Sequence, residues 1–399
     1  MSNNLLGRLH AMQAELTFIR QDIHAYPETA MKEVRTSAMV AAKLRQWGIS
    51  VTEEVGNLGV VGTLKSNKPG NRSIGLRADM DALEVIEKND LSYASTIPGI
   101  MHACGHDGHA TMLLGAAKYL SENRDSFSGT VYFIFQPAEE KYSGAIAMIK
   151  DRLFDRFPMD AIYGLHNIVG LPVGQFAIRS GPMMAAADTW TVTFRGTGGH
   201  GATPHLAIDV TVVLAQFIVA LQTIVSRNIA ATDTGVVSVG AIQSGFFESL
   251  NVLPSEVRVG GTVRSFTKEV RDIIERRINE LAHGIATSFG CIAEVIFNRQ
   301  GLALVNDIQS TKRAIKVAES LVSAENVDSN TTPVTNAEDF AEMLERKPGA
   351  HMFIGNGQQS GGLHSPTYNF NDDTIILGVG YWISLVQQEL QNELHVSAL

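Results

Sequence analysis

Apolar positions in the first part of the chain follow two spacings that alternate along the sequence. Apolar residues recur every three to four positions in four segments, which predicts helices at 5–24, 33–47, 107–121 and 144–154. Short apolar runs without that spacing predict buried strands at 60–64, 73–79, 131–136 and 161–167. Strands that alternate with helices in this way are typical of α/β proteins, in which helices cover both faces of a largely parallel sheet.

The pattern changes near residue 183. Strands are predicted at 189–196, 235–243, 256–265 and 291–299, with helices at 205–227 and 268–290. This β-α-β-β-α-β order is typical of a ferredoxin-like α+β domain. The first pattern then resumes, with predicted helices at 307–323, 337–345 and from about 373, and a strand at 351–355. We therefore predict a domain formed by residues 1–183 and 300–399, with a second domain, 184–299, inserted in it.

Composition and charge argue against a nucleic-acid-binding protein and against a membrane protein. The chain has 399 residues, enough for roughly two to three domains, and a net charge of −9 with scattered acidic residues, which argues against a nucleic-acid or membrane surface. The most apolar stretch, 206–225, carries Asp209, Gln216 and Gln222, so we interpret it as a core helix. Two cysteines form no disulfide framework, and the N-terminus lacks a secretory pattern, so we expect a cytoplasmic protein.

The segment MHACGHDGH, residues 101–109, opens one of the predicted helices and holds Cys104 and His106. Thiolate and imidazole are ligands of transition metals. A redox pair is disfavoured because Cys104 has no CxxC partner; the other cysteine is Cys291. A nucleophilic cysteine and a set of helix-capping residues remain as alternatives.

Further polar residues stand where predicted strands end. Asp79 closes one strand, Glu139 and Glu140 follow another, His166 closes a third, and His364 lies in a loop rich in Gly, Asn and Ser. Sites of parallel sheets form beyond the carboxyl ends of the strands, where these side chains would meet. The candidate ligands of two divalent metal ions are therefore Cys104, His106, Glu140, His166 and His364. The alternative for each histidine is a satisfied core or loop residue.

The Glu139–Glu140 pair and Asp79 could also have roles other than metal binding. Glu139 and its neighbour Glu140 point in different directions at a strand end, so one can bind metal while the other faces the substrate as a general base. The alternative is a solvated acidic turn. Asp79 could orient a ligand imidazole, or it could cap the next turn.

The inserted domain offers three more candidates. His200 lies in the glycine-rich turn GTGGHGATPH, which lacks the lysine of a phosphate-binding P-loop. Asn251 and Arg264 could bind a carboxylate, although an arginine at the end of a strand is by default a solvated charge. The sequence contains no GxSxG and no HExxH, which argues against the corresponding hydrolases.

Six motifs together resemble the metal-dependent amidohydrolases typified by hippurate hydrolase. This family includes N-acyl-amino-acid hydrolases (aminoacylases) and plant auxin-conjugate hydrolases. The motifs follow the family order: MHACGHDGH, FQPAEE (135–140), GLHN (164–167), GGHGATPH (198–205), NAEDF (336–340) and LHSPTYNFND (363–372). The resemblance implies a zinc-peptidase-like catalytic domain with two divalent ions and an inserted lid domain that mediates dimerisation. The mixed sulfur, nitrogen and oxygen ligands suit Zn, Mn, Co or Ni.

Matched motif by motif, the resemblance also assigns roles. It makes Glu139 the general base, and His200 a lid residue that helps to hold the oxyanion, in related enzymes often at the partner subunit's site. Asn251 and Arg264 match positions associated with the substrate carboxylate. Asp79 matches the acid behind the metal site. The metal ligands implied are Cys104, His106, Glu140, His166 and His364. In much of the wider group a histidine ligand stands at the position of Arg77, and here the cysteine replaces it.

The resemblance predicts hydrolysis of the amide bond of an N-acyl amino acid or a related conjugate, which releases a carboxylic acid and an amino acid. The partner is then a small molecule, with no nucleic acid or membrane, and the enzyme is a homodimer or a dimer-based oligomer. A metallo-dipeptidase or carboxypeptidase with the same metal centre is the alternative. A catalytically silent metal-binding protein would lack a ligand or the base, and this sequence retains both.

Overall fold

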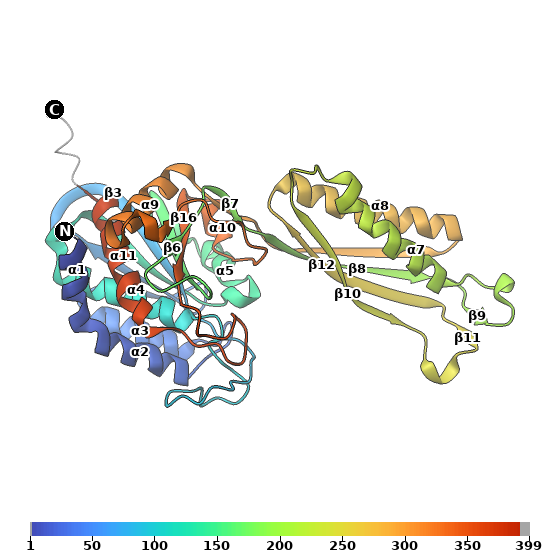
Figure 1. Ribbon diagram of the computed structural model, residues 1–399, viewed down its shortest axis with the longest axis horizontal. Coiled ribbons are helices and arrows are strands. Elements are labelled where there is room, and N and C mark those ends of the chain that lie inside the picture. The colour runs from blue at the N-terminus through green and yellow to red at the C-terminus, as the bar shows by residue number, and fades with distance from the viewer. Residues whose placement is uncertain (1, 392–399) are drawn as a thin grey trace. The chain divides into compact units, whose positions relative to one another are not determined.

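The computed structural model describes residues 2–391, which form two compact units (Figure 1). Unit 1 comprises the chain up to Met183, residues 305–332, and the chain from Asp339 onward. Unit 2 comprises Met184–Leu304 together with Pro333–Glu338. Each unit has its own sheet and its own core, and each is described by itself.

Unit 1 is built on an eight-stranded sheet with the order β1-β2-β4-β3-β5-β16-β6-β15. β3 pairs in parallel with β4 and β5, and β5 pairs in parallel with β16. The large, mostly parallel sheet confirms the predicted α/β class. The strands are β1 Ser50–Val55, β2 Gly59–Lys65, β3 Lys68–Asp79, β4 Ser128–Gln136, β5 Ala161–Ile168, β6 Phe176–Ala177, β15 Val327–Asp328 and β16 Gly349–Gly355.

Helices pack against this sheet, and the pair α4 and α11 is the most deeply buried (Figure 1). A Cβ at Gly115 of α4 would lie 2.6 Å from Val379 of α11, so glycine permits their close approach. The helices of the unit are α1 Ser2–Leu9, α2 Gln13–Ala25, α3 Val34–Gln46, α4 His106–Glu122, α5 Gly144–Lys150, α6 Leu153–Arg156, α9 Ile308–Val322, α10 Ala341–Leu344 and α11 Ile375–Glu389.

Some predicted helices differ from the structure. The segment 5–24 is not one helix, because a 3-10 turn at His10–Met12 separates α1 from α2. The segment 144–154 is not one helix, because Arg152 adopts a left-handed conformation (φ 63°) between α5 and α6. The helix predicted at 337–345 is wrong in its first residues. The Asp339 carboxylate is held by the side chain of Gln136 at 2.7 Å and by the Ala145 N–H at 2.9 Å. Those buried bonds hold Asp339 in a turn, and α10 begins only at Ala341.

Unit 2 has an antiparallel four-stranded sheet in the order β10-β12-β8-β13, which is the ferredoxin-like strand order. Its core joins the sheet to two helices through Trp190, Phe194 and Phe217. The elements are β8 Ala186–Arg195, β10 Gly235–Ser244, β12 Glu256–Ser265, β13 Ile292–Gly301, α7 Val210–Thr223 and α8 Lys268–Phe289. A short ribbon, β9 Gly199–His200 with β11 Val252–Leu253, extends from this sheet.

The apolar stretch that we interpreted as a core helix is buried on one face only. Within the described residues, Val210–Asn228 is the one helix long and apolar enough to span a membrane by length and composition, and 28% of it is buried. Phe217 and Leu221 pack into the core, whereas Val212 and Val219 are 45% and 70% exposed. The helix therefore presents a second, uncovered apolar face.

Candidate metal centre

The start of α4 is fixed so that the residues on either side of Gly105 face the end of the sheet. Gly105 has φ +92°, and a Cβ there would lie 2.3 Å from the Asn167 side chain, so the turn requires glycine. The buried Asp107 carboxylate ties this first turn to α2. It accepts hydrogen bonds from Arg20 at 3.1 Å and His24 at 2.9 Å. Cys104 and His106 are thus held rigidly beside the strand ends.

The five candidate ligands form two groups that share one residue. Cys104, His106 and His166 offer ligand atoms that lie within 4.8 Å of one another, and so do Cys104, Glu140 and His364. The Cys104 Sγ lies 3.5 Å from His166 Nε2, and the His364 Nε2 lies 3.4 Å from Glu140 Oε1. One thiolate is therefore within reach of two cation positions.

The side chains present fit divalent cations. The donors combine sulfur, nitrogen and oxygen, a mixture suited to first-row transition metals. Within the described part of the chain, His106 Nε2 and Glu140 Oε1 are buried and accept or donate no hydrogen bond. A buried polar atom without a partner costs about 1–3 kcal/mol. A coordinated cation would remove that cost at His106 Nε2, and it would bind Glu140 Oε1 beside its ion-pair partner His364.

The proton affinities of the group also favour a cation. Burial raises the pKa of the Cys104 thiol, and the carboxylates of Glu140 and Glu139 raise it further. Burial opposes the charging of His106, but Asp79, Asp81 and Glu140 outweigh it and raise its pKa to about 10. Without a metal ion, Cys104 and His106 therefore tend to keep their protons, because several carboxylates lie close to them. A metal ion that binds there displaces these protons.

Asp79, at the end of β3, is buried and binds neighbours of the ligands. It accepts hydrogen bonds from His109 Nδ1 at 2.6 Å and from Arg77 at 2.7 Å, whereas His106 Nε2 is 3.9 Å away. Burial alone would raise the pKa of Asp79, but the charges of His106, His109 and Arg77 lower it well below its usual range. His109 Nε2 also lies 2.7 Å from the Oδ1 and 3.0 Å from the backbone N of Asn167, which links Asp79 to the residue after His166.

Asp81 is a residue whose importance the sequence did not reveal. Its two oxygens accept the backbone N–H groups of Glu139 and Glu140, each at 3.0 Å, and Oδ1 lies 3.3 Å from His106 Nδ1. One carboxylate therefore orients the candidate base and two candidate ligands. The only signal for it was a second acid, two residues after Asp79, at the same strand end.

Glu139 belongs to neither of these two groups, although one of its carboxylate oxygens lies within 4.8 Å of ligand atoms of His106 and Glu140. Its side chain is 8% exposed, and Oε2 is 4.0 Å from His106 Nε2. Its other oxygen accepts the N–H of Asp339 at 3.4 Å. A carboxylate held next to the cation positions, with its own backbone support, is placed to exchange a proton with a water molecule there.

Of the three candidates in unit 2, His200 and Asn251 lie together, and Arg264 lies elsewhere. His200 in β9 pairs with Val252 of β11, and the Asn251 carbonyl accepts the Gly201 N–H at 2.8 Å, so His200 and Asn251 lie on one exposed ribbon. Arg264, on β12, donates to the carbonyls of Val263 at 2.9 Å and Thr335 at 3.2 Å. Its guanidinium is thus positioned by backbone oxygens and has no carboxylate partner in the described residues.

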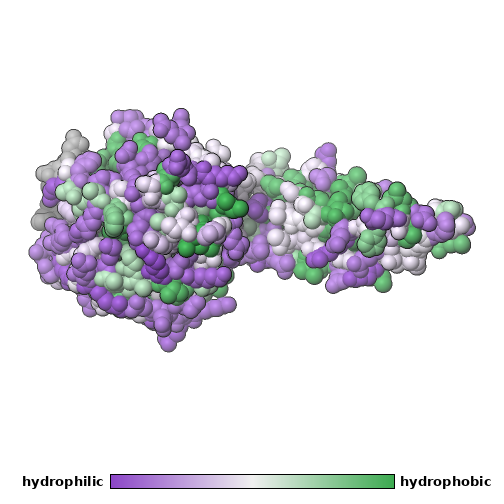
Figure 2. Space-filling view, turned by 90° about the horizontal axis from the view of Figure 1, so that it is seen from below, coloured by the Kyte–Doolittle hydropathy of each residue, from purple (hydrophilic) through white to green (hydrophobic). Residues whose placement is uncertain are grey.

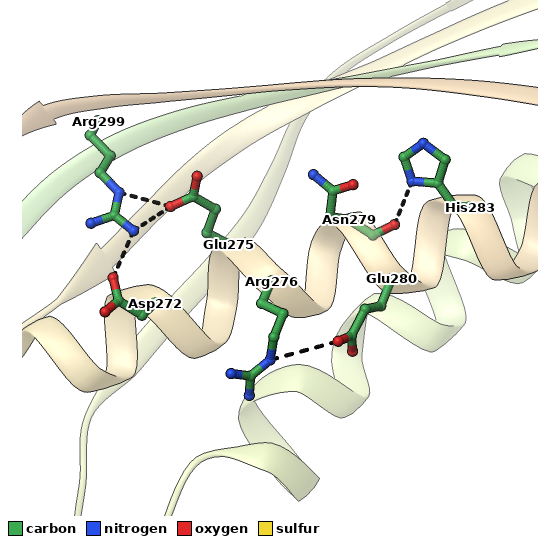
Figure 3. Close-up of a pocket in the computed structure, with 7 residues that line it drawn as sticks. All are labelled: Asp272, Glu275, Arg276, Asn279, Glu280, His283 and Arg299. Carbon is green, nitrogen blue, oxygen red and sulfur yellow. Dashed lines mark hydrogen bonds and ion pairs between the residues drawn. The ribbon is translucent and has the colours of Figure 1, made fainter.

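A groove on α8 of unit 2 also gathers charged side chains (Figure 3). Arg299 binds Asp272 at 2.7 Å, and Arg276 is 3.7 Å from Glu280. These are exposed pairs of opposite charge, which contribute little and offer no converging ligand atoms. The groove is a solvated surface and not a second site.

Known proteins are similar to this sequence over nearly the whole chain. The family described as peptidase family M20/M25/M40 matches residues 75–388. The chain is 38% identical over 391 residues to hippurate hydrolase of Campylobacter jejuni, covering 97% of this chain and 100% of that one. It is 38% identical over 375 residues to N-acetyl-L-cysteine deacetylase of Bacillus subtilis, covering 94% and 88%. It is 37% identical over 368 residues to thermostable carboxypeptidase 1 of Saccharolobus solfataricus, covering 90% and 91%.

A solved structure agrees with the fold. The Bacillus subtilis YXEP protein, described as a dinuclear metal binding peptidase from the M20 family, matches with a TM-score of 0.84 and 30% sequence identity. The match covers 96% of this chain and 99% of that one. Together, the sequence and structural matches confirm the family resemblance drawn from the motifs.

Proposed function

Because the chain belongs to peptidase family M20/M25/M40 and is a metal-dependent amide hydrolase, we propose that its substrates are N-acyl amino acids or related amide conjugates. The products are a carboxylic acid and an amino acid. One observation carries this proposal: two groups of ligand atoms share Cys104 beside the separate carboxylate of Glu139.

We propose that two divalent ions occupy these groups, one held by Cys104, His106 and His166, the other by Cys104, Glu140 and His364. When bound, such ions polarise the scissile carbonyl and lower the pKa of water. Zinc, manganese, cobalt and nickel all suit the mixed donors. A thiolate ligand must stay reduced, which supports our assignment of the enzyme to the cytoplasm.

Glu139 then moves the proton. Its carboxylate takes a proton from the attacking water and returns it to the nitrogen of the leaving amino acid, so that the C–N bond breaks with a neutral amine leaving. Asp81 fixes the backbone of Glu139, and Asp339 donates its N–H to the Glu139 side chain. Both contacts restrict the carboxylate to one orientation.

Unit 2 is proposed to act as the lid. His200 donates a hydrogen bond to the developing oxyanion, and Arg264 with Asn251 binds the carboxylate of the amino acid, for which the planar guanidinium is well shaped. Two observations support these roles. His200 and Asn251 share one exposed ribbon, and Arg264 has no carboxylate partner in the described part of unit 2.

A substrate panel tests the proposed function. Metal-stripped protein, supplied with each of the four metals, should hydrolyse acetyl- and benzoyl-amino acids faster than dipeptides with a free amine. Analogues in which the α-carboxylate is replaced by a carboxamide should show a raised KM, and His200→Ala should lower kcat. Faster turnover of free-amine dipeptides would favour the metallo-dipeptidase or carboxypeptidase alternative.

We also propose that the enzyme is a homodimer formed through the uncovered face of α7 and the adjoining edge strand β10. Val212 and Val219 are exposed on that face, and in Figure 2 hydrophobic side chains gather in patches on unit 2, on the right. Contiguous exposed apolar surface of this kind marks interaction sites.

Light scattering tests the dimer. The wild-type enzyme should have twice the mass of one chain, and Val219→Glu should shift it toward the monomer because a charge would be buried in the interface. Ile292→Glu, at a 68% exposed position on the opposite edge strand β13, is the matched control. A dimer that survives Val219→Glu and is lost in Ile292→Glu would place the interface at β13 instead.

A further inference from the structure

The turn that carries Glu139 and Glu140 has an unusual backbone. Ala138, which follows Pro137 at the end of β4, adopts a left-handed conformation with φ +52°, and Tyr142 closes the turn with φ +50°. Residues other than glycine occupy this region only when the surrounding structure holds them there. The contacts that hold Ala138 therefore also set where the general base and one metal ligand point.

Three successive N–H groups of this turn are accepted by two buried carboxylates. Asp81 takes those of Glu139 and Glu140, as described above, and Glu33 Oε1 takes that of Ala138 at 2.8 Å. Glu33 is fully buried, and its second oxygen has no hydrogen-bond partner among the described residues. It comes from the loop between α2 and α3, about a hundred residues away from the turn along the chain.

Glu33 is not needed by its own helix. It occupies the N-cap position of α3, yet its side chain makes no capping hydrogen bond. The free N–H groups at the start of α3 are bound instead by Glu28, whose two oxygens accept those of Arg35 and Thr36, each at 2.9 Å. Outside its own loop, where the backbone of Glu33 and Met31 also stabilises it, the buried carboxyl of Glu33 is therefore held by the Ala138 N–H of the catalytic turn.

We propose that Glu33 is a positioning residue for catalysis: by accepting the Ala138 N–H it fixes the left-handed start of the turn, and so aligns Glu139 with the water and Glu140 with its metal ion. This proposal rests on the proposed function and names a further residue of the same site. Burial raises the pKa of Glu33 to about 7, and the charge of Asp81 contributes. A neutral side chain of the same shape should therefore serve equally well.

Three substitutions at Glu33 and one matched pair at Glu28 test the proposal. Glu33→Ala leaves the Ala138 N–H unpaired, Glu33→Asp withdraws the acceptor by one bond, about 1.5 Å, and Glu33→Gln retains an acceptor oxygen at full length. Glu28→Ala and Glu28→Gln alter a carboxylate of the same loop that binds only the N–H groups of α3. Each variant is measured for kcat and KM, for the affinity of the stripped protein for zinc, and for Tm.

We expect kcat to fall about 10- to 100-fold in Glu33→Ala and Glu33→Asp with little change in KM, since misplacement by about 1 Å has effects of this size. Zinc affinity should fall in parallel because Glu140 shares the turn. Glu33→Gln should remain within about threefold of wild type, and the Glu28 variants should lower Tm without this loss of kcat. If Glu33→Ala fails to fold, the kcat and zinc affinity of Glu33→Asp, compared with those of Glu33→Gln, still test the positioning role.

Two outcomes would overturn the proposal. The first is a kcat and zinc affinity in Glu33→Asp equal to those of wild type. The second is a loss in Glu33→Ala that Glu28→Ala matches at the same fall in Tm, which would make the role merely structural. Failure of the proposed function has a different signature: wild-type enzyme would hydrolyse no N-acyl amino acid, while zinc affinity would still fall in Glu33→Ala and Glu33→Asp.

Discussion

Glu139→Gln is expected to lower kcat by about 10³- to 10⁴-fold, the upper range of what a general acid–base residue contributes. Glutamine keeps the shape of the side chain and can still accept the N–H of Asp339. It cannot take a proton from water. Because Glu139 stands outside both groups that share Cys104, the variant should bind its metals as wild type does. Steady-state kinetics together with metal analysis by mass spectrometry check both halves of the prediction.

Two further variants make the test of Glu139 specific. Glu84→Gln, at an exposed carboxylate in the segment that follows Asp81, should leave kcat unchanged. Glu140→Gln should lose metal, because its Oε1 is the oxygen that lies 3.4 Å from His364. Turnover by Glu139→Gln close to that of wild type would exclude Glu139 as the base, whatever its metal content.

Much of the site could be predicted because it depends on the ends of buried strands. Apolar runs locate β3, β4 and β5, and polar residues directly after them lie at one edge of a parallel sheet. Asp79, Glu139 and His166 follow this rule, and the structure places them together. The metal roles of the five candidate ligands stay a prediction, although their ligand atoms converge.

What could not be predicted depends on contacts between segments far apart in the sequence. Glu33 lies in an ordinary helix-start pattern, and only the folded chain shows its side chain turned toward Ala138. Asp339 was placed in a helix because its neighbours have helical periodicity, yet its bonds to Gln136 and Ala145 override that local preference. The spacing of apolar residues along the sequence does not indicate which buried carboxylates will form tertiary hydrogen bonds.

Removal of the shared ligand should have the largest effect on metal content. In Cys104→Ala both groups lose the one residue that they have in common, so we expect both ions to be lost and hydrolysis to fall below detection. The loss should not come from misfolding, since the substitution removes one sulfur atom from a position held by Gly105 and the Asp107 network. Circular dichroism of stripped wild-type and variant proteins should coincide.

Cys104→Asp distinguishes a bridging ligand from a cysteine nucleophile. A carboxylate can bind two cations, one through each oxygen, but it does not replace a thiolate that must attack a carbonyl and leave again. Partial recovery of metal content and turnover in Cys104→Asp, with none in Cys104→Ala, would therefore support the shared-ligand role. Full metal content in Cys104→Ala without activity would contradict it and would restore the nucleophile as the better explanation. The structure favours the ligand, because the Cys104 Sγ lies within 4.8 Å of the ligand atoms of both groups.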